Sequence, residues 1–310
     1  MNYCRITYAP CAEAAYSAQG LSLLSKGLKD LESLPFSADE QRREAALHKE
    51  KMSIQGVQPK FGAHLNVRKN AFELSDVSST FILKPQNIDF PQLPENEAVT
   101  MQMARICGIE VPISGLVGSK DGSLTYFIRR FDRLTKGKKL SVEDFAQLTG
   151  NDRELKYRSS MEKIAEVVTT FCTFPAVEKV KLFRLVLFNF LVGNEDAHLK
   201  NWSLITRNGK IELAPAYDLL NSTIVLRGPN IEEFALPLAG KKRKLTRELL
   251  VDYYGRERLK LSEKSIEQVL NDFQKADAEW ERLLSVCFLS PELKVAYQEF
   301  LRQRKQLLSI

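Results

Sequence analysis

The chain of 310 residues is long enough for one large domain or for two lobes of ordinary size. Apolar residues make up 44% and charged residues 27%, typical of a folded protein with a substantial core, and no apolar run approaches the ~20 residues that a membrane span needs. The net charge of +6 suits an anionic ligand, but it falls short of the dense basic surface of a nucleic-acid-binding protein.

The cysteines and the N-terminal segment indicate the cellular compartment. The five cysteines are widely scattered and form no CxxC pair, which argues against a disulfide framework or a zinc site. The N-terminal segment contains Arg5 and lacks the uninterrupted apolar run of a signal peptide. We therefore expect a cytoplasmic protein that does not associate with membranes.

The N-terminal half is predicted to be mostly β-structure. Its alternating or apolar runs predict strands at residues 3–8, 61–67, 79–84, 112–118 and 123–131, the last two joined by an Asp121-Gly122 turn. Two helices are expected among these strands. A capping box over residues 37–40 opens one that ends near residue 48, and Pro94 opens another that runs through Ile106 and ends at Gly108.

The C-terminal half is predicted to be mostly helical. Helical spacing is found at residues 142–148, 160–172, 177–192, 263–286 and 291–308. The order, strands first and helices second, predicts an α+β fold with two lobes whose boundary lies near residues 132–140.

A polar cluster, Gly193 to Asn201, directly follows the apolar helix 177–192 and marks a surface loop. Within it, Asp196 and Asn201 are separated by four residues, the Asp-x4-Asn spacing of a kinase catalytic loop. In such loops the aspartate accepts the proton of the attacking hydroxyl, and the asparagine oxygen binds magnesium.

A hairpin is predicted directly after this loop. Strands at 202–205 and 210–214 flank Asn208-Gly209, so the hairpin returns Asp218 close to Asn201. Two oxygen ligands together with nucleotide phosphates suit Mg²⁺, which makes Asp218 a candidate second metal ligand. The alternative for each aspartate is that it only caps a turn.

Two further residues of the loop have two interpretations each. His198 either orients the loop through hydrogen bonds, which is the preferred interpretation, or contacts phosphate. Lys200 either neutralises the charge of a transferred phosphoryl group or faces solvent.

The N-terminal half contains candidate phosphate-binding residues. Lys84 ends an apolar strand, where kinases place the lysine that binds the α- and β-phosphates. Glu95 and Glu97 begin the following helix, and each either pairs with Lys84 or interacts with the helix dipole. A glycine beside a lysine in the segment Ser53 to Lys60 is a weak phosphate-loop signal.

Several ordered motifs together resemble the HipA-like serine/threonine kinases of bacterial toxin–antitoxin modules. They are SIQGVQPK, FILKP, ENEAVTMQMARICGIEVP, FIRRFDR, VEDFAQLTG, GNEDAHLKN and APAYDL, and they span roughly residues 50–225. The chain begins only about 50 residues before the first motif, so it resembles the short form, HipT, whose additional N-terminal subdomain is a separate small protein, HipS.

The resemblance implies a bilobal HipA-type kinase fold. Its expected parts are an N-terminal extension over residues 1–50, an N-lobe over 51–133 and a helical C-lobe over 134–310. It also implies site residues, as follows. Asp196 would be the catalytic base, Asn201 and Asp218 the magnesium ligands, and Lys84 the phosphate lysine paired with Glu97 or Glu95. ATP would further be bound by Ser53, Gln55, Gly56, Val57, Lys60, Arg130, Phe131, Gln147, His198 and Lys200, with the adenine hinge at Arg130 and Phe131.

The implied activity is ATP- and Mg²⁺-dependent phosphorylation of a protein serine or threonine, with an aminoacyl-tRNA synthetase as the expected target. Ser53 falls on the autophosphorylated serine whose modification disables ATP binding in this family. A HipS-like subunit and a HipB-like DNA-binding antitoxin are the expected partners. Two features depart from ordinary protein kinases, because Asp218 is followed by Leu219 and Leu220 instead of Phe-Gly and the HRD arginine is absent.

Two alternatives remain open at this point. A small-molecule phosphotransferase of the aminoglycoside or lipid kinase type shares the Asp-x4-Asn loop. Its acidic substrate pocket conflicts with the basic residues of the 222–260 region, Arg227, Lys241, Lys242, Arg243 and Lys244. A non-enzymatic binding protein with an inactive kinase fold is the second alternative, although the base and both metal ligands are present.

Overall fold

The computed structural model describes residues 2–47, 58–75, 79–134, 138–150, 155–226 and 232–310. The chain divides into two compact units: unit 1 comprises Met1–Gln102, Pro112–Gly137 and Ser285–Leu289, and unit 2 comprises Met103–Val111, Lys138–Leu284 and Ser290–Ile310. Unit 1 carries a five-stranded sheet and unit 2 is mostly helical, which confirms the predicted α+β fold. None of the described helices is both long and apolar enough to span a bilayer.

The sheet of unit 1 is antiparallel, in the order β4-β3-β5-β7-β6. Its strands are β3 (Phe61–Asn66), β4 (Ala71–Leu74), β5 (Phe81–Lys84), β6 (Ser114–Gly118) and β7 (Leu124–Arg129). The predicted turn between β6 and β7 is present, with Gly122 at φ +80°. β5 is the central strand, so Lys84 at its end is surrounded by protein.

The N-terminal segment packs on this sheet through β1 (Asn2–Tyr3), β2 (Pro10–Cys11), α1 (Ala18–Leu24) and α2 (Ala38–Leu47). Cys4, Ile6 and several leucines share one hydrophobic cluster with Phe61 and Phe127 of the sheet. The predicted strand at 3–8 is wrong. Its alternation is real, because Cys4, Ile6 and Tyr8 are all buried, but these residues point into the core from an irregular turn in which Tyr8 has φ 59°.

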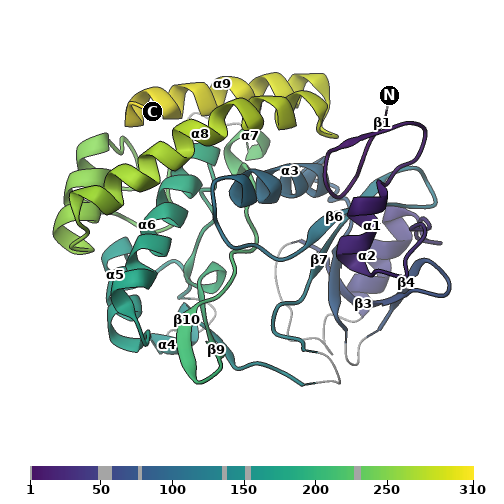
Figure 1. The fold of residues 1–310 in the computed structure, drawn as a ribbon, viewed down its shortest axis with the longest axis horizontal. Coiled ribbons are helices and arrows are strands. Elements are labelled where there is room, and N and C mark those ends of the chain that lie inside the picture. The colour runs from purple at the N-terminus through teal and green to yellow at the C-terminus, as the bar shows by residue number, and fades with distance from the viewer. Residues whose placement is uncertain (1, 48–57, 76–78, 135–137, 151–154, 227–231) are drawn as a thin grey trace. The chain divides into compact units, whose positions relative to one another are not determined.

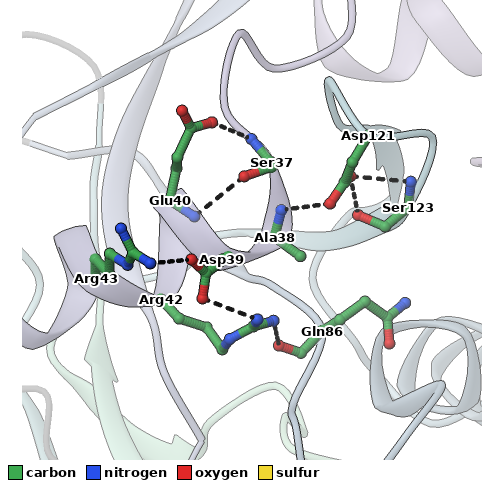
Figure 2. Close-up of polar contacts among 9 residues, drawn as sticks. All are labelled: Ser37, Ala38, Asp39, Glu40, Arg42, Arg43, Gln86, Asp121 and Ser123. Atoms are coloured by element: carbon green, nitrogen blue, oxygen red, sulfur yellow. Dashed lines mark hydrogen bonds and ion pairs between the residues drawn. The ribbon is translucent and has the colours of Figure 1, made fainter.

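The capping box predicted for α2 is present (Figure 2). The Ser37 hydroxyl accepts a hydrogen bond from the Glu40 N–H at 3.2 Å, and the Glu40 carboxylate accepts one from the Ser37 N–H at 2.7 Å. Asp121, in the turn between β6 and β7, accepts the Ala38 N–H at 2.9 Å. The first turn of α2 is therefore capped from two places in the sequence, which fixes the helix to the sheet.

Unit 2 is built on four long helices, α5 (Met161–Phe171), α6 (Pro175–Val192), α8 (Glu263–Val286) and α9 (Pro291–Leu308). All four were predicted, and the Ser290 side chain caps the start of α9 by accepting from the Leu293 N–H. α3 (Leu93–Ile106) begins in unit 1 and ends in unit 2 at Gly108, which has φ +79°. Figure 1 shows α8 and α9 side by side, and Lys305 of α9 forms an ion pair with Asp277 of α8.

Three elements of unit 2 differ from the prediction or were not predicted. The helix predicted over 142–148 is instead strand β8 (Val142–Asp144) followed by the short helix α4 (Phe145–Leu148), because Asp144 caps α4 and pairs as a strand residue. The short helix α7 (Ser222–Leu226) and the π-helix η3 (Glu248–Arg258) were not predicted.

A second, three-stranded sheet of order β10-β9-β8 positions the polar loop of unit 2. β9 (Ser203–Arg207) and β10 (Lys210–Leu213) form the predicted hairpin, with Asn208 and Gly209 at φ 50° and 73° in its turn. Both positive φ angles are those of the tight turn that matches strand twist. The 3₁₀ helix η2 (Leu199–Asn201) leads into β9 and contacts α4.

Candidate active site

The loop that follows α6 begins at a residue that ends the helix sharply. Gly193 caps α6 with φ 71°, a left-handed conformation that favours glycine. A Cβ at this position would lie 2.6 Å from Cε1 of Phe300 and 2.9 Å from Oγ1 of Thr223. The close approach of α9 and α7 therefore fixes where the loop leaves the helix.

Hydrogen bonds hold the loop residues after Gly193 in one conformation. Ser222 Oγ donates to the Gly193 carbonyl at 3.1 Å and accepts from the Glu195 N–H at 2.9 Å. The indole N–H of Trp202 donates to the Ala197 carbonyl at 3.1 Å. Asp196 lies between these two anchored positions and is exposed at the surface.

Asp196 accepts a side-chain hydrogen bond from Tyr157. Its Oδ1 lies 2.6 Å from the hydroxyl of Tyr157, which donates to it. The main-chain oxygen of Asp196 accepts from the His198 N–H at 2.7 Å, so the backbone turns directly after the aspartate. The side chain itself is exposed, as a base that must reach an external hydroxyl requires.

The hairpin brings Asn201 and Asp218 together, as the sequence predicted. The amide nitrogen Nδ2 of Asn201 lies 3.3 Å from Oδ2 of Asp218 and donates to it. Because a carboxylate can only accept, this contact fixes the orientation of the Asn201 amide. Among the described residues, no group donates a hydrogen bond to the other amide atom, Oδ1, although that oxygen is buried.

An orphaned buried oxygen is costly unless a ligand satisfies it. Oδ1 of Asn201 next to a carboxylate is a hard-oxygen donor set of the kind that Mg²⁺ uses in phosphoryl-transfer sites. Asp218 has φ 55°, a left-handed conformation that is uncommon outside glycine and is found at functional sites. The donor set therefore fits a magnesium ion.

Tyr217 connects the hairpin back to the loop. Its hydroxyl donates to the Lys200 carbonyl at 2.9 Å and lies 2.5 Å from Ser203 Oγ. Burial raises the pKa of Tyr217, so the hydroxyl stays protonated and remains a donor. These contacts place Asp218, the next residue, beside Asn201.

His198 is buried inside the loop. Its Nδ1 lies 3.3 Å from the Lys200 N–H, and its Nε2 lies 2.9 Å from the ammonium of Lys156. Burial lowers the pKa of His198 and favours the neutral ring, which has a single acceptor nitrogen, so the ring accepts either from the Lys156 ammonium or from the Lys200 N–H, depending on its tautomer. These contacts favour the role in loop geometry over a contact with phosphate.

Unit 1 pairs the predicted phosphate lysine with a glutamate. Lys84 is 5% exposed, and its ammonium lies 2.7 Å and 2.9 Å from the two carboxylate oxygens of Glu97 on α3. Glu95 does not take this role, because both of its oxygens accept hydrogen bonds from Gln86, at 2.8 Å and 2.9 Å. Of the two candidates, Glu97 is thus the partner of Lys84.

Other predicted ATP-binding residues are engaged in ways that the sequence did not show. The Arg130 N–H donates to the Thr80 carbonyl at 2.9 Å, so this N–H belongs to the sheet and cannot serve an adenine hinge. The Gln147 side chain accepts from the Asp144 N–H at 2.9 Å and completes the capping box of α4. Phe131 and Lys60 are half-buried, the latter directly before β3. Ser53, Gln55, Gly56 and Val57 lie outside the described residues.

Several residues of the site were not found from the sequence. They are Lys156, Tyr157, Trp202, Tyr217 and Ser222, which contact the loop through side-chain hydrogen bonds, and Asn194, whose Nδ2 donates to the Asp218 carbonyl. Tyr217 stands directly before Asp218, so adjacency was an available signal. Tyr157 lies 39 residues before Asp196 and carried none.

The family model for the HipA-like C-terminal domain matches residues 52–280. A Haemophilus influenzae protein named "Putative kinase" is 31% identical over 260 residues, which cover 78% of this chain and 75% of that protein. The "Serine/threonine-protein kinase toxin HipA" of Shewanella oneidensis is 30% identical over 193 residues, which cover 56% of this chain and 44% of the toxin.

Two solved structures share the fold at low sequence identity. One is a chain of the Shewanella oneidensis toxin–antitoxin complex of HipA, HipB and operator DNA, with a TM-score of 0.64 and 20% identity over 91% of this chain and 72% of that one. The other is the Helicobacter pylori proinflammatory kinase CtkA, with a TM-score of 0.56 and 18% identity over 83% of this chain and 91% of that one.

Proposed function

The chain belongs to the HipA-like C-terminal domain family, and from this premise we propose that it is an ATP- and Mg²⁺-dependent kinase that phosphorylates serine or threonine in proteins. The observation that carries the proposal is the orientation of Asn201. Its amide donates to Asp218 and leaves a buried oxygen, beside a carboxylate, to which no group in the described parts of the chain donates. A structural asparagine in a turn would use that oxygen to cap the backbone.

Asn201 and Asp218 are the residues that would hold the metal. When bound, Mg²⁺ neutralises charge on the phosphate oxygens of the nucleotide. The half-exposed position of both residues suits an ion that keeps several waters and takes few protein ligands.

Asp196 would act as the base. As the oxygen of the acceptor hydroxyl bonds to the γ-phosphorus, the bond from that phosphorus to the bridging oxygen of ADP breaks, and the hydroxyl proton passes to the Asp196 carboxylate. The exposed side chain and the anchored backbone of the loop support this role, because the base must be accessible and still be held in place.

The buried ion pair of Lys84 and Glu97 supports nucleotide binding by unit 1. A lysine–glutamate pair between a sheet strand and the following helix is part of the phosphate-binding apparatus of protein kinases. Breaking such a pair is strongly destabilising, so Glu97 also holds the ammonium in one position.

We further propose that the kinase is the toxin of a bacterial toxin–antitoxin system and is the HipT-like short form. The relative from Shewanella oneidensis bears the name of such a toxin, and the 193 matched residues cover 44% of it. The proposed target is an aminoacyl-tRNA synthetase, and the proposed partners are a HipS-like subunit and a HipB-like antitoxin. Self-inactivation by phosphorylation of Ser53 belongs to the same proposal.

The test is incubation of the purified chain with γ-labelled ATP and Mg²⁺, alone and with added acceptors. Label on the chain itself or on an added protein supports the proposal. Label on aminoglycosides or small polyols alone would instead identify a small-molecule phosphotransferase. Absence of any transfer, with nucleotide still bound, would favour a binding protein with an inactive kinase fold.

A further inference from the structure

We propose that the hydroxyl of Tyr157 occupies the acceptor-binding position of Asp196, so that a substrate hydroxyl must displace it before phosphoryl transfer. This inference rests on the proposed function, in which Asp196 is the base. It makes Tyr157 a residue that sets the affinity for the acceptor without taking part in the chemistry.

The contact has the geometry of a base with its acceptor. The Tyr157 oxygen lies 2.6 Å from Oδ1 of Asp196, the short distance of a hydroxyl that donates to a carboxylate. An acceptor hydroxyl must donate to the same carboxylate at a similar distance to lose its proton to it. The tyrosine hydroxyl therefore occupies a place that a serine, a threonine or a water would need.

The tyrosine ring is held by the loop that carries the base. It packs edge-on against the His198 ring, with the centroids 5.1 Å apart and the planes at 85°, and the Lys156 ammonium lies 4.9 Å from its centroid. The same ammonium contacts His198 Nε2, and the Lys156 carbonyl accepts from the Leu199 N–H at 3.2 Å. Residues 156 and 157 are thus held to the loop by three contacts, two with His198 and one with Leu199.

Tyr157 is nevertheless free to yield to a substrate. Its side chain is 43% exposed, so rotation of the hydroxyl away from Asp196 leaves no cavity in the core. Burial and the Asp196 carboxylate together raise the pKa of Tyr157, which keeps the hydroxyl protonated and donating until it is displaced. Displacement costs one hydrogen bond, and the incoming hydroxyl restores one.

The test is the Tyr157→Phe variant, which removes only the competing oxygen. Tyr253→Phe is the matched control, because the Tyr253 hydroxyl also donates to a carboxylate, that of Glu162 at 3.1 Å, in another part of unit 2. Initial rates are measured with myelin basic protein as the serine- and threonine-containing acceptor, and ATP hydrolysis is measured with water as the acceptor.

We expect Tyr157→Phe to lower the KM for the protein acceptor by about 3- to 10-fold, the effect of one hydrogen bond, with kcat and the KM for ATP within about 2-fold of wild type. ATP hydrolysis should rise, and Tyr253→Phe should change none of these values. An unchanged acceptor KM, or a lower kcat at unchanged KM, would show that Tyr157 aligns the base or does nothing, and would overturn this inference alone. Wild-type protein that transfers no phosphate to any acceptor would overturn the proposed function, and this inference with it.

Discussion

At the scale of single residues, the orientation of one amide decides how Asn201 is interpreted. The hydrogen bond to Asp218 fixes the position of the Asn201 amide nitrogen. The buried amide oxygen Oδ1 is therefore left to bind a metal ion. The Asn201→Ala variant removes this oxygen and should weaken ATP binding in Mg²⁺ by about 10-fold or more, while binding in excess chelator stays unchanged. Calorimetric titration in both buffers measures this. Equal affinity of variant and wild type in Mg²⁺ would remove Asn201 from the metal site.

The raised pKa of the Glu95 carboxyl should make the stability of the protein depend on pH. Burial on α3 raises its pKa from 4.5 to about 7, although Gln86 donates to both of its oxygens. An acid whose pKa is raised on folding stabilises the folded state only while it is protonated. Its contribution is therefore complete below about pH 4.5 and is lost as the pH rises through about 7.

The neutral variant Glu95→Gln should remove this dependence. From pH 5 to pH 8, the free energy of unfolding of the variant should increase relative to that of wild type by up to about 3 kcal/mol. This is the free energy that corresponds to the rise in the pKa of Glu95 from 4.5 to about 7. Urea unfolding of both proteins at the two pH values measures the difference. Parallel pH profiles would show that Glu95 is ionised throughout.

At the scale of elements, α2 depends on two caps. Ser37→Ala removes the hydroxyl that accepts the Glu40 N–H and should lower the free energy of unfolding by about 1 kcal/mol. Asp121→Ala removes the cap that the β6–β7 turn supplies and should cost a similar amount. Because both caps serve the same helix turn (Figure 2), the double variant should depart from the sum of the two single variants. Strict additivity in denaturant unfolding would mean that the two caps act independently.

The end of α6 gives a second prediction at this scale. Gly193 and Gly209 both have positive φ, at +71° and +73°, but an added Cβ meets Phe300 and Thr223 only at Gly193. Gly209→Ala should therefore cost about 1 kcal/mol of unfolding free energy through backbone strain alone, and Gly193→Ala about 1–3 kcal/mol more. Gly193→Ala should also slow phosphoryl transfer, since its carbonyl anchors the loop through Ser222. Equal losses of stability for the two variants would contradict this account.

Elements with strong local signals were predictable. The hairpin turn at Asn208-Gly209 and the Ser37 cap follow from residue type, and α8 and α9 follow from helical spacing. β8 and η3 could not be found in this way. The three residues of β8 form a strand because β9 pairs with them, and the π-helix η3 has no distinct sequence period to reveal it.

At the scale of the whole molecule, the family and the α+β fold followed from the motifs, and both are confirmed. Half of the candidate site followed as well, since Asp196, Asn201 and Asp218 lie within one loop and one hairpin. The remainder depends on contacts across long stretches of sequence. Lys156 and Tyr157 reach the loop over about 40 residues.

The assignment of segments to the two units also depends on contacts between residues that are far apart in the sequence. Ser285–Leu289 belongs to unit 1, where the Phe288 ring lies 5.6 Å from that of Tyr8, although its neighbours in sequence belong to unit 2. No change in composition marks this short segment. Packing against the N-terminal residues, and not local propensity, determines its place.

The central claim is that Asp196 accepts the proton of the acceptor while other residues hold the nucleotide. Its most direct test compares the transfer of labelled phosphate from ATP by wild type and by Asp196→Asn, together with the affinity of each for Mg²⁺ and ATP by calorimetry. The account predicts affinity within about 2-fold of wild type and transfer lowered by about 10²- to 10⁴-fold, the contribution of a positioned general base. Transfer by Asp196→Asn at the wild-type rate would contradict it.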